Sequence, residues 1–133
     1  MALILDTNAL SAFADGDPGM AGALADQTQL AIPVIVLGEY LYGIRRSRFR
    51  KRYERWLEES AGAFAILEIG IETASQYAAI RQELRDSGSP IPTNDVWIAA
   101  LAREYRCPVL TRDRHFATLQ GVRVRTWPRT PAS

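Results

Sequence analysis

The sequence predicts an α/β fold in which a central parallel sheet of four to five strands lies between two layers of helices. Short apolar runs alternate with longer amphipathic stretches along all 133 residues, which is the pattern of parallel strands joined by crossover helices. No repeat, low-complexity tract or long linker divides the chain, and its length is that of one domain. We therefore expect a single three-layer α/β/α domain over residues 1–133, with 128–133 a loose C-terminal tail.

Five short apolar runs are the expected strands, and they are Ala2–Leu5, Leu30–Ile32, Ala63–Leu67, Val109–Thr111 and Val122–Thr126. Between the first two runs, Asp17 followed by Pro18 predicts a helix with an N-cap and proline at its first position. A second helix is expected directly after Pro33. Helical spacing predicts that its apolar side is formed by Val36, Leu37, Leu41 and Ile44.

Two further helices are expected before the fourth strand. Residues 73–76 have capping-box spacing, which predicts a helix starting at Thr73, and Gly88 suits its C-terminal end. After a loop rich in proline and serine, a dense apolar pattern from Asn94 predicts a largely buried helix whose core includes Trp97.

Composition narrows the class of protein. The chain is 47% hydrophobic and 23% charged, as in an ordinary globular domain. Its start has no basic region and carries an acid at position 6, so no signal peptide is predicted. The longest apolar stretch, 30–38, is far short of the roughly 20 residues that span a bilayer. The lone Cys107 excludes an internal disulfide and is expected to be a buried structural thiol. A cytoplasmic setting without a membrane segment is expected.

Four acidic residues interrupt or follow strongly apolar sequence. Asp6 and Asp113 follow the first and fourth predicted strands. Glu39 is expected early in the helix after Pro33, and Asp95 in the first turn of a helix, where the helix dipole favours a carboxylate. Because functional groups gather at the carboxyl ends of parallel strands, we expect all four at one edge of the sheet.

Four carboxylates that lie close together repel one another, so either a cation lies between them or some of them are protonated. Two carboxylates ~4 Å apart repel by about 4 kcal/mol at an effective dielectric near 20. Oxygen ligands favour Mg²⁺ or Mn²⁺ over zinc. The alternative is that the four acids are independent caps and turn residues. The remaining acids that we considered are interpreted as solvated (Glu54, Glu58, Glu59, Glu83, Asp86 and Glu104) or as caps near helix ends and turns (Asp15, Asp17 and Asp26).

Four motifs occur in order along nearly the whole chain, and they are Asp6-Thr7-Asn8, Gly38–Gly43, Asn94–Ala100 and Leu110–Phe116. Together they resemble the PIN-domain ribonucleases, in particular the VapC-type toxins of bacterial toxin–antitoxin pairs. The resemblance implies that Asp6, Glu39, Asp95 and Asp113 are catalytic residues and ligands of Mg²⁺ or Mn²⁺. It also implies supporting roles for Asn8 and Thr111. One departure is that residues 34–37 contain no serine or threonine, which many relatives carry there.

The resemblance further implies the strand order 3-2-1-4-5 and cleavage of RNA. A water activated by the metal would attack the phosphorus in line, with one carboxylate as a possible general base. It also implies an antitoxin that covers the active-site groove, and a homodimer.

A basic stretch from Arg45 to Trp56 interleaves arginines with three aromatic residues. The helical spacing of Phe49, Tyr53 and Trp56 predicts that they pack inward. The arginines face solvent, where they could attract RNA phosphates or an acidic antitoxin segment, or form an ordinary solvated helix. The candidate RNA or antitoxin contacts are Arg45, Arg46, Arg48, Arg112 and Arg114. For His115, a structural hydrogen-bonding role is favoured over general-base catalysis.

Two other classes of protein share parts of this acidic pattern. A receiver domain also carries acids around Mg²⁺, but it needs a lysine after a late strand, and the only lysine is Lys51. An aspartate-nucleophile phosphatase needs an acid two positions after its nucleophile, where this chain has Asn8. A housekeeping RNA-processing nuclease and a catalytically silent RNA-binding module stay open.

Overall fold

The computed structural model describes residues 2–25 and 29–129, in which five strands form one entirely parallel sheet. The strands are β1 (Ala2–Leu5), β2 (Gln29–Pro33), β3 (Phe64–Leu67), β4 (Val109–Leu110) and β5 (Val124–Arg125). They lie in the order β3-β2-β1-β4-β5, which confirms the expected order 3-2-1-4-5. β2 is slightly longer than predicted, whereas β3, β4 and β5 are shorter.

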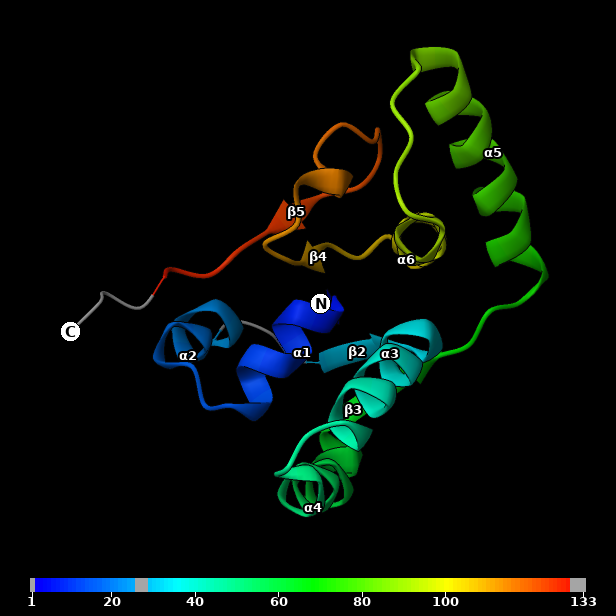
Figure 1. Ribbon diagram of the computed structural model, residues 1–133. Helices are drawn as coiled ribbons and strands as arrows, with labels where there is room; N and C mark the ends of the chain where they lie inside the picture. The colour runs from blue at the N-terminus through cyan, green and yellow to red at the C-terminus, as the bar shows by residue number, and fades with distance from the viewer. Residues whose placement is uncertain (1, 26–28, 130–133) are drawn as a thin grey trace.

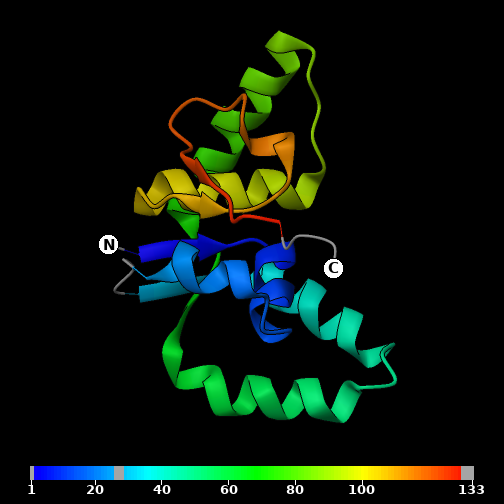
Figure 2. The ribbon, with the colours of Figure 1, turned by 90° about the vertical axis from the view of Figure 1, so that its left-hand side faces the viewer.

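Within the described ranges, six helices and two short 3₁₀ turns connect the strands. They are α1 (Thr7–Ala14), α2 (Pro18–Leu24), α3 (Val34–Arg45), α4 (Arg50–Ser60), η1 (Ala61–Ala63), α5 (Ile71–Ser87), α6 (Thr93–Tyr105) and η2 (Arg114–Phe116). In Figure 1, α5 and α6 lie to the right of the strands and α1 and α2 to their left, and Figure 2 looks onto the side of α1 and α2. This three-layer α/β/α arrangement is the predicted fold class. No helix within the described residues combines the length and apolar character needed to cross a bilayer.

The core is built from the two central strands and the helices that cover them. Leu3, Ile4 and Leu5 of β1 are fully buried, as are Val96, Ile98 and Ala99 to Leu101 of α6. A strand that is covered on both faces has a continuous apolar sequence, and this pattern predicts β1 from the run Ala2–Leu5.

Asp17 and Gly88 are confirmed as helix ends, whereas the predicted helix start at Thr73 is wrong. Asp17 caps α2 by accepting a hydrogen bond from the Gly19 amide at 2.9 Å, and Gly88 ends α5 with φ of 68°, which glycine adopts without strain. The helix predicted to start at Thr73 starts at Ile71 instead. Thr73 is its third residue, and its hydroxyl accepts a hydrogen bond from the Gly70 amide at 3.0 Å.

The inward face of α3 also differs from the prediction. Val36, Tyr40 and Ile44 are buried, whereas Leu41 is 37% exposed, because residues four apart, rather than the mixed set predicted, point toward α1 and the sheet. Glu39 is the sixth of the twelve residues of α3, so it lies mid-helix and not early.

Three side chains expected inside are at the periphery. Phe49 is 46% exposed, whereas Tyr53 and Trp56 pack against the core as predicted. Trp97 is partly buried and stacks on Tyr77 of α5, with ring centroids 3.9 Å apart. Cys107 is only partly buried.

The start of the predicted tail is held in place. The Pro128 carbonyl accepts a hydrogen bond from the Arg112 guanidinium at 3.0 Å. It also packs closely on α2, since a Cβ at Gly19 would lie 2.6 Å from it. The rest of that tail, 130–133, and Asp26 lie outside the described residues.

Candidate active site

The carboxyl ends of β1 and β4 place Asp6 beside Thr111. Leu5 pairs with Leu110 in the sheet, and the Asp6 amide donates to the Leu110 carbonyl at 3.1 Å. One residue further on, the Thr111 hydroxyl donates to Asp6 Oδ2 at 2.7 Å. The same hydroxyl oxygen accepts from the Asp113 amide at 2.9 Å, so Thr111 links two of the predicted acids.

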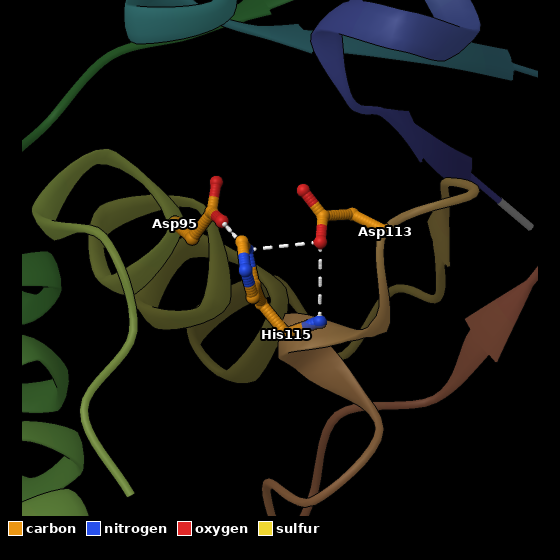
Figure 3. A group of neighbouring side chains, drawn as sticks. All are labelled: Asp95, Asp113 and His115. Carbon is orange, nitrogen blue, oxygen red and sulfur yellow. Dashed lines mark hydrogen bonds and ion pairs between the residues drawn. The ribbon is translucent and has the colours of Figure 1, made fainter.

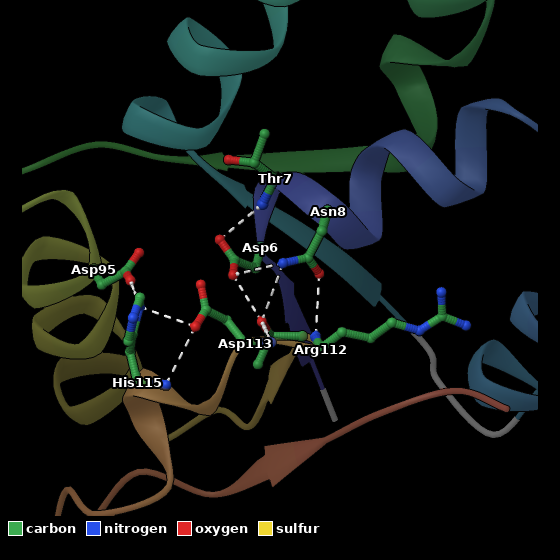
Figure 4. A network of polar contacts seen from close by, with 8 residues as sticks. Asp6, Thr7, Asn8, Asp95, Arg112, Asp113 and His115 are labelled. Carbon is green, nitrogen blue, oxygen red and sulfur yellow. Dashed lines mark hydrogen bonds and ion pairs between the residues drawn. The ribbon is translucent and has the colours of Figure 1, made fainter. Parts of the chain in front are cut away.

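Asn8 completes this link from the first turn of α1. Its Nδ2 donates to Asp6 Oδ2 at 3.3 Å, and its Oδ1 accepts from the Arg112 amide at 3.2 Å. The carboxylate of Asp6 therefore has a fixed orientation (Figure 4). Asn8 and Thr111, to which the resemblance assigns supporting roles, both donate hydrogen bonds to the Asp6 carboxylate.

Asp95 and Asp113 meet at the imidazole of His115. Asp95 lies in the first turn of α6, and its Oδ2 is 2.5 Å from His115 Nδ1. The same nitrogen is 2.9 Å from Asp113 Oδ1, so the ring lies between the two carboxylates (Figure 3). In the part of the chain that the structure describes, these three residues are the one group that offers donor atoms all within 4.8 Å of one another.

Glu39 is the outer member of the predicted set. Its residue is exposed, and it interacts electrostatically with Asp6 and Asp95. The structure thus places all four acids at the carboxyl edge of the sheet, with three at close range and Glu39 toward solvent.

Residues 3–122 match the PIN domain family. The chain belongs to the PIN-domain family. Ribonuclease VapC5 of Mycobacterium tuberculosis is 31% identical over 120 residues, which span 89% of this chain and 87% of that protein. Ribonuclease VapC of Rickettsia bellii is 33% identical over 96% of this chain and 98% of its own length. Within the family, this chain is therefore a PIN domain of the VapC type.

Solved structures agree with this assignment. VapBC-5 from Mycobacterium tuberculosis, a member of the VapBC family of toxin–antitoxin systems, superimposes with a TM-score of 0.73 at 31% identity, covering 94% of this chain and 96% of that one. DNA-bound VapBC from Salmonella typhimurium has a TM-score of 0.85 at 24% identity, covering 96% of this chain and 99% of that one. At that identity the second likeness supports the fold alone.

Three of the four acids in this PIN domain have a raised pKa. Burial raises the pKa of Asp6 above its ordinary value, although the hydrogen bond from Thr111 opposes the rise. Burial also raises the pKa of Asp95, against the effect of the hydrogen bond to His115. For Glu39, burial and the charges of Asp6 and Asp95 raise the pKa. In each case the ionised form is disfavoured, which is the condition that a bound cation relieves.

These shifts predict an unusual pH dependence of stability. In metal-free protein, the native state binds more protons than the unfolded state between the ordinary aspartate pKa of 3.8 and the raised values of Asp6 and Asp95. The contribution of these two acids to the unfolding free energy should therefore fall as pH rises through that interval. Urea unfolding in EDTA across this range should show a less negative slope in Asp95→Asn than in the parent. Identical slopes would contradict the raised pKa.

Thr111→Val should weaken the site without removing a ligand. The valine loses the hydrogen bonds to Asp6 and Asp113, and such supporting contacts are typically worth ~10–100-fold in metal affinity. Calorimetric titration with Mn²⁺ measures the change. Thr118→Val, at an exposed position of the same C-terminal region, should bind Mn²⁺ as the parent does. Equal affinity in both variants would show that Thr111 does not position the carboxylates.

All five candidate arginine contacts are exposed, as an RNA or antitoxin contact requires. They are Arg45, Arg46, Arg48, Arg112 and Arg114. Arg112 turns away from the acids (Figure 4), and its guanidinium lies 4.2 Å from the centroid of the Trp127 ring. With its hydrogen bond to Pro128, this placement is that of a residue that holds the C-terminal segment.

A cavity of about 230 Å³ connects the acidic edge to the basic stretch. It is lined by residues of both regions, among them Thr7, Ser11, Asp15, Glu39, Ser47 and Tyr53. Tyr53 of α4 donates to Asp15 Oδ1 at 2.7 Å, which ties α4 to the end of α1. Two residues of the basic stretch, Ser47 and Tyr53, therefore line the same cavity as Glu39.

Proposed function

We propose that this chain is a divalent-metal-dependent endoribonuclease and the toxin of a toxin–antitoxin pair. The observation that carries the proposal is the convergence of Asp6, Asp95, Asp113 and Glu39 at one sheet edge in a PIN domain of the VapC type. The named ribonucleases among its relatives support the choice of RNA as substrate.

The residues present fit Mg²⁺ or Mn²⁺. Asp6, Asp95, Asp113 and Glu39 would hold the ion with carboxylate oxygens, the ligands that hard divalent cations prefer. Burial, with a smaller effect of the neighbouring carboxylates, raises the pKa of Asp6, Glu39 and Asp95, so a cation would stabilise their ionised forms. When bound, the ion supplies Lewis acidity, which activates a water and offsets negative charge on the phosphodiester.

The protein residues contribute positioning and proton transfer. Thr111 and Asn8 hold Asp6 in one orientation. Glu39 is exposed and has a raised pKa, which suits a group that accepts the proton of an attacking water. The α6 dipole favours negative charge at Asp95.

The RNA strand would run from the acidic edge toward the basic stretch. Arg48 and Arg52 lie over the exposed ring of Phe49, with guanidinium carbons 4.9 and 5.9 Å from its centroid. Exposed aromatic rings beside arginines suit stacking of single-stranded bases and attraction of phosphates. The charge of Arg45, Arg46, Arg48 and Arg114 serves the same purpose in this proposal.

Cleavage assays on single-stranded RNA and on structured tRNA test the nuclease. Cutting should require Mg²⁺ or Mn²⁺, stop with EDTA and resume when the metal is restored. Asp6→Asn should abolish RNA cleavage. Asp86→Asn should cleave RNA like the parent, because the Asp86 carboxylate only contacts Gln82 on the exposed side of α5. Metal-independent cutting, or full activity in Asp6→Asn, would overturn the four-acid site. RNA binding without any cutting would favour a silent RNA-binding module.

Expression in bacteria tests the toxin. Growth should arrest, and an antitoxin encoded in the adjacent reading frame should relieve the arrest and co-purify with the chain. The VapBC complexes among the structural relatives support such a partner, and a homodimer belongs to the same proposal. Cleavage without growth arrest, and no neighbouring partner gene, would favour a housekeeping nuclease.

A further inference from the structure

His115 brings a nitrogen donor into a site otherwise made of carboxylates. Its Nδ1 lies 2.5 Å from Asp95 Oδ2 and 2.9 Å from Asp113 Oδ1 (Figure 3). These atoms come from two distant segments, the first turn of α6 and the turn η2. No feature of the carboxylate cluster requires a nitrogen at this position.

The spacing fits one coordination sphere. Ligand atoms bonded at ~2.1 Å and at right angles around an ion are ~3 Å apart, and opposite ligands are ~4.2 Å apart. All three donors lie within 4.8 Å of one another, so a single ion can contact all of them after small side-chain shifts.

The fold fixes the imidazole near the two acids. The His115 amide donates to Asp113 Oδ1 at 3.3 Å, which orders the turn that carries the ring. The next residue, Phe116, is fully buried and anchors that turn in the core. The His115 side chain remains 40% exposed, which leaves it room to adjust.

The type of donor has consequences for the choice of metal. Mg²⁺ prefers oxygen ligands, whereas first-row transition ions also accept imidazole nitrogen. We propose that His115 ligates the ion through Nδ1, together with Asp95 and Asp113, and that this makes the site select Mn²⁺ over Mg²⁺. The proposal rests on the proposed metal-dependent function and assigns a ligand and a preference to its site.

The chain contains one histidine, so a spectroscopic test is unambiguous in tag-free protein. Pulsed electron paramagnetic resonance of bound Mn²⁺ should show the nitrogen coupling of a directly bound imidazole. His115→Gln should lose that coupling, and its Mn²⁺ affinity should fall by at least about tenfold, with a smaller change in Mg²⁺ affinity. Arg114→Gln, in the same turn, should keep the coupling.

The outcomes separate this inference from the nuclease itself. Bound Mn²⁺ without nitrogen coupling, in a protein that still cleaves RNA, would overturn the ligand role and leave the nuclease standing. Failure to bind either ion, with no cleavage, would overturn both. Should His115→Gln fail to fold, the spectrum of the parent protein decides alone. Equal losses of Mn²⁺ and Mg²⁺ affinity in a folded variant would overturn the preference.

Discussion

Asp95→Asn should abolish metal-dependent RNA cleavage while raising the thermal stability of the metal-free protein. The Asp95 carboxylate is a proposed ligand of the metal ion. Loss of the ion removes several kcal/mol of charge stabilisation from the transition state, which lowers the rate by about 10³-fold or more. Burial disfavours the Asp95 charge, as its raised pKa indicates, so the neutral amide should cost less to bury. Amide and imidazole can still form a hydrogen bond.

Cleavage rates in Mn²⁺ and the Tm in EDTA measure the two effects. Glu72→Gln is the matched control, because Glu72 lies in the first turn of α5 as Asp95 lies in the first turn of α6. That variant should keep its activity and gain no stability. A fall in the metal-free Tm of Asp95→Asn would mean that its hydrogen bond to His115 outweighs the burial of its charge.

Phe116→Ala should destabilise the fold by about 3–5 kcal/mol, the usual cost of deleting a fully buried phenylalanine. Phe116 is 0% exposed and directly follows His115. Loosening this turn should also weaken Mn²⁺ binding in the fraction that remains folded, because Asp113 and His115 lose their common support.

Urea unfolding and Mn²⁺ titration well below the melting temperature measure these changes. Phe49→Ala removes the same side chain from a position that is 46% exposed, and it should change the unfolding free energy by less than about 1 kcal/mol. Similar costs for the two variants would contradict the anchoring role of Phe116.

Several elements could be predicted because their signal is local. The first apolar run ends at Asp6 in both sequence and structure, since a strand buried on both faces leaves a continuous pattern. Asp17 and Gly88 were recognised as helix ends because capping depends on neighbouring backbone atoms. The strand order came from family resemblance and is confirmed by the pairing of the strands.

The incorrect predictions depended on packing between segments. Leu41 and Phe49 have helical spacing but lie outside, because α1 and the sheet contact other positions of α3 and the helix α4 presents Tyr53 and Trp56 instead. The sequence predicts a loose tail that includes Pro128, yet the Pro128 carbonyl accepts a hydrogen bond from Arg112 and packs closely on Gly19. Spacing along one segment does not show which face another segment will cover.

The sequence is enough to predict the parallel α/β fold and to place Asp6, Asp95 and Asp113 after strands or in a first helical turn. Asp6 could be identified because it directly follows an apolar strand, and Asp113 because it lies three residues beyond the end of another. The position of His115 between Asp95 and Asp113, and that of Glu39 outside them, depend on how distant segments pack together. The reason is physical: twenty residues separate Asp95 from His115 in the chain, and their contact depends on how α6 packs beside the turn after β4. The raised pKa values follow from the same packing, because burial and the distances between charges are set by the fold.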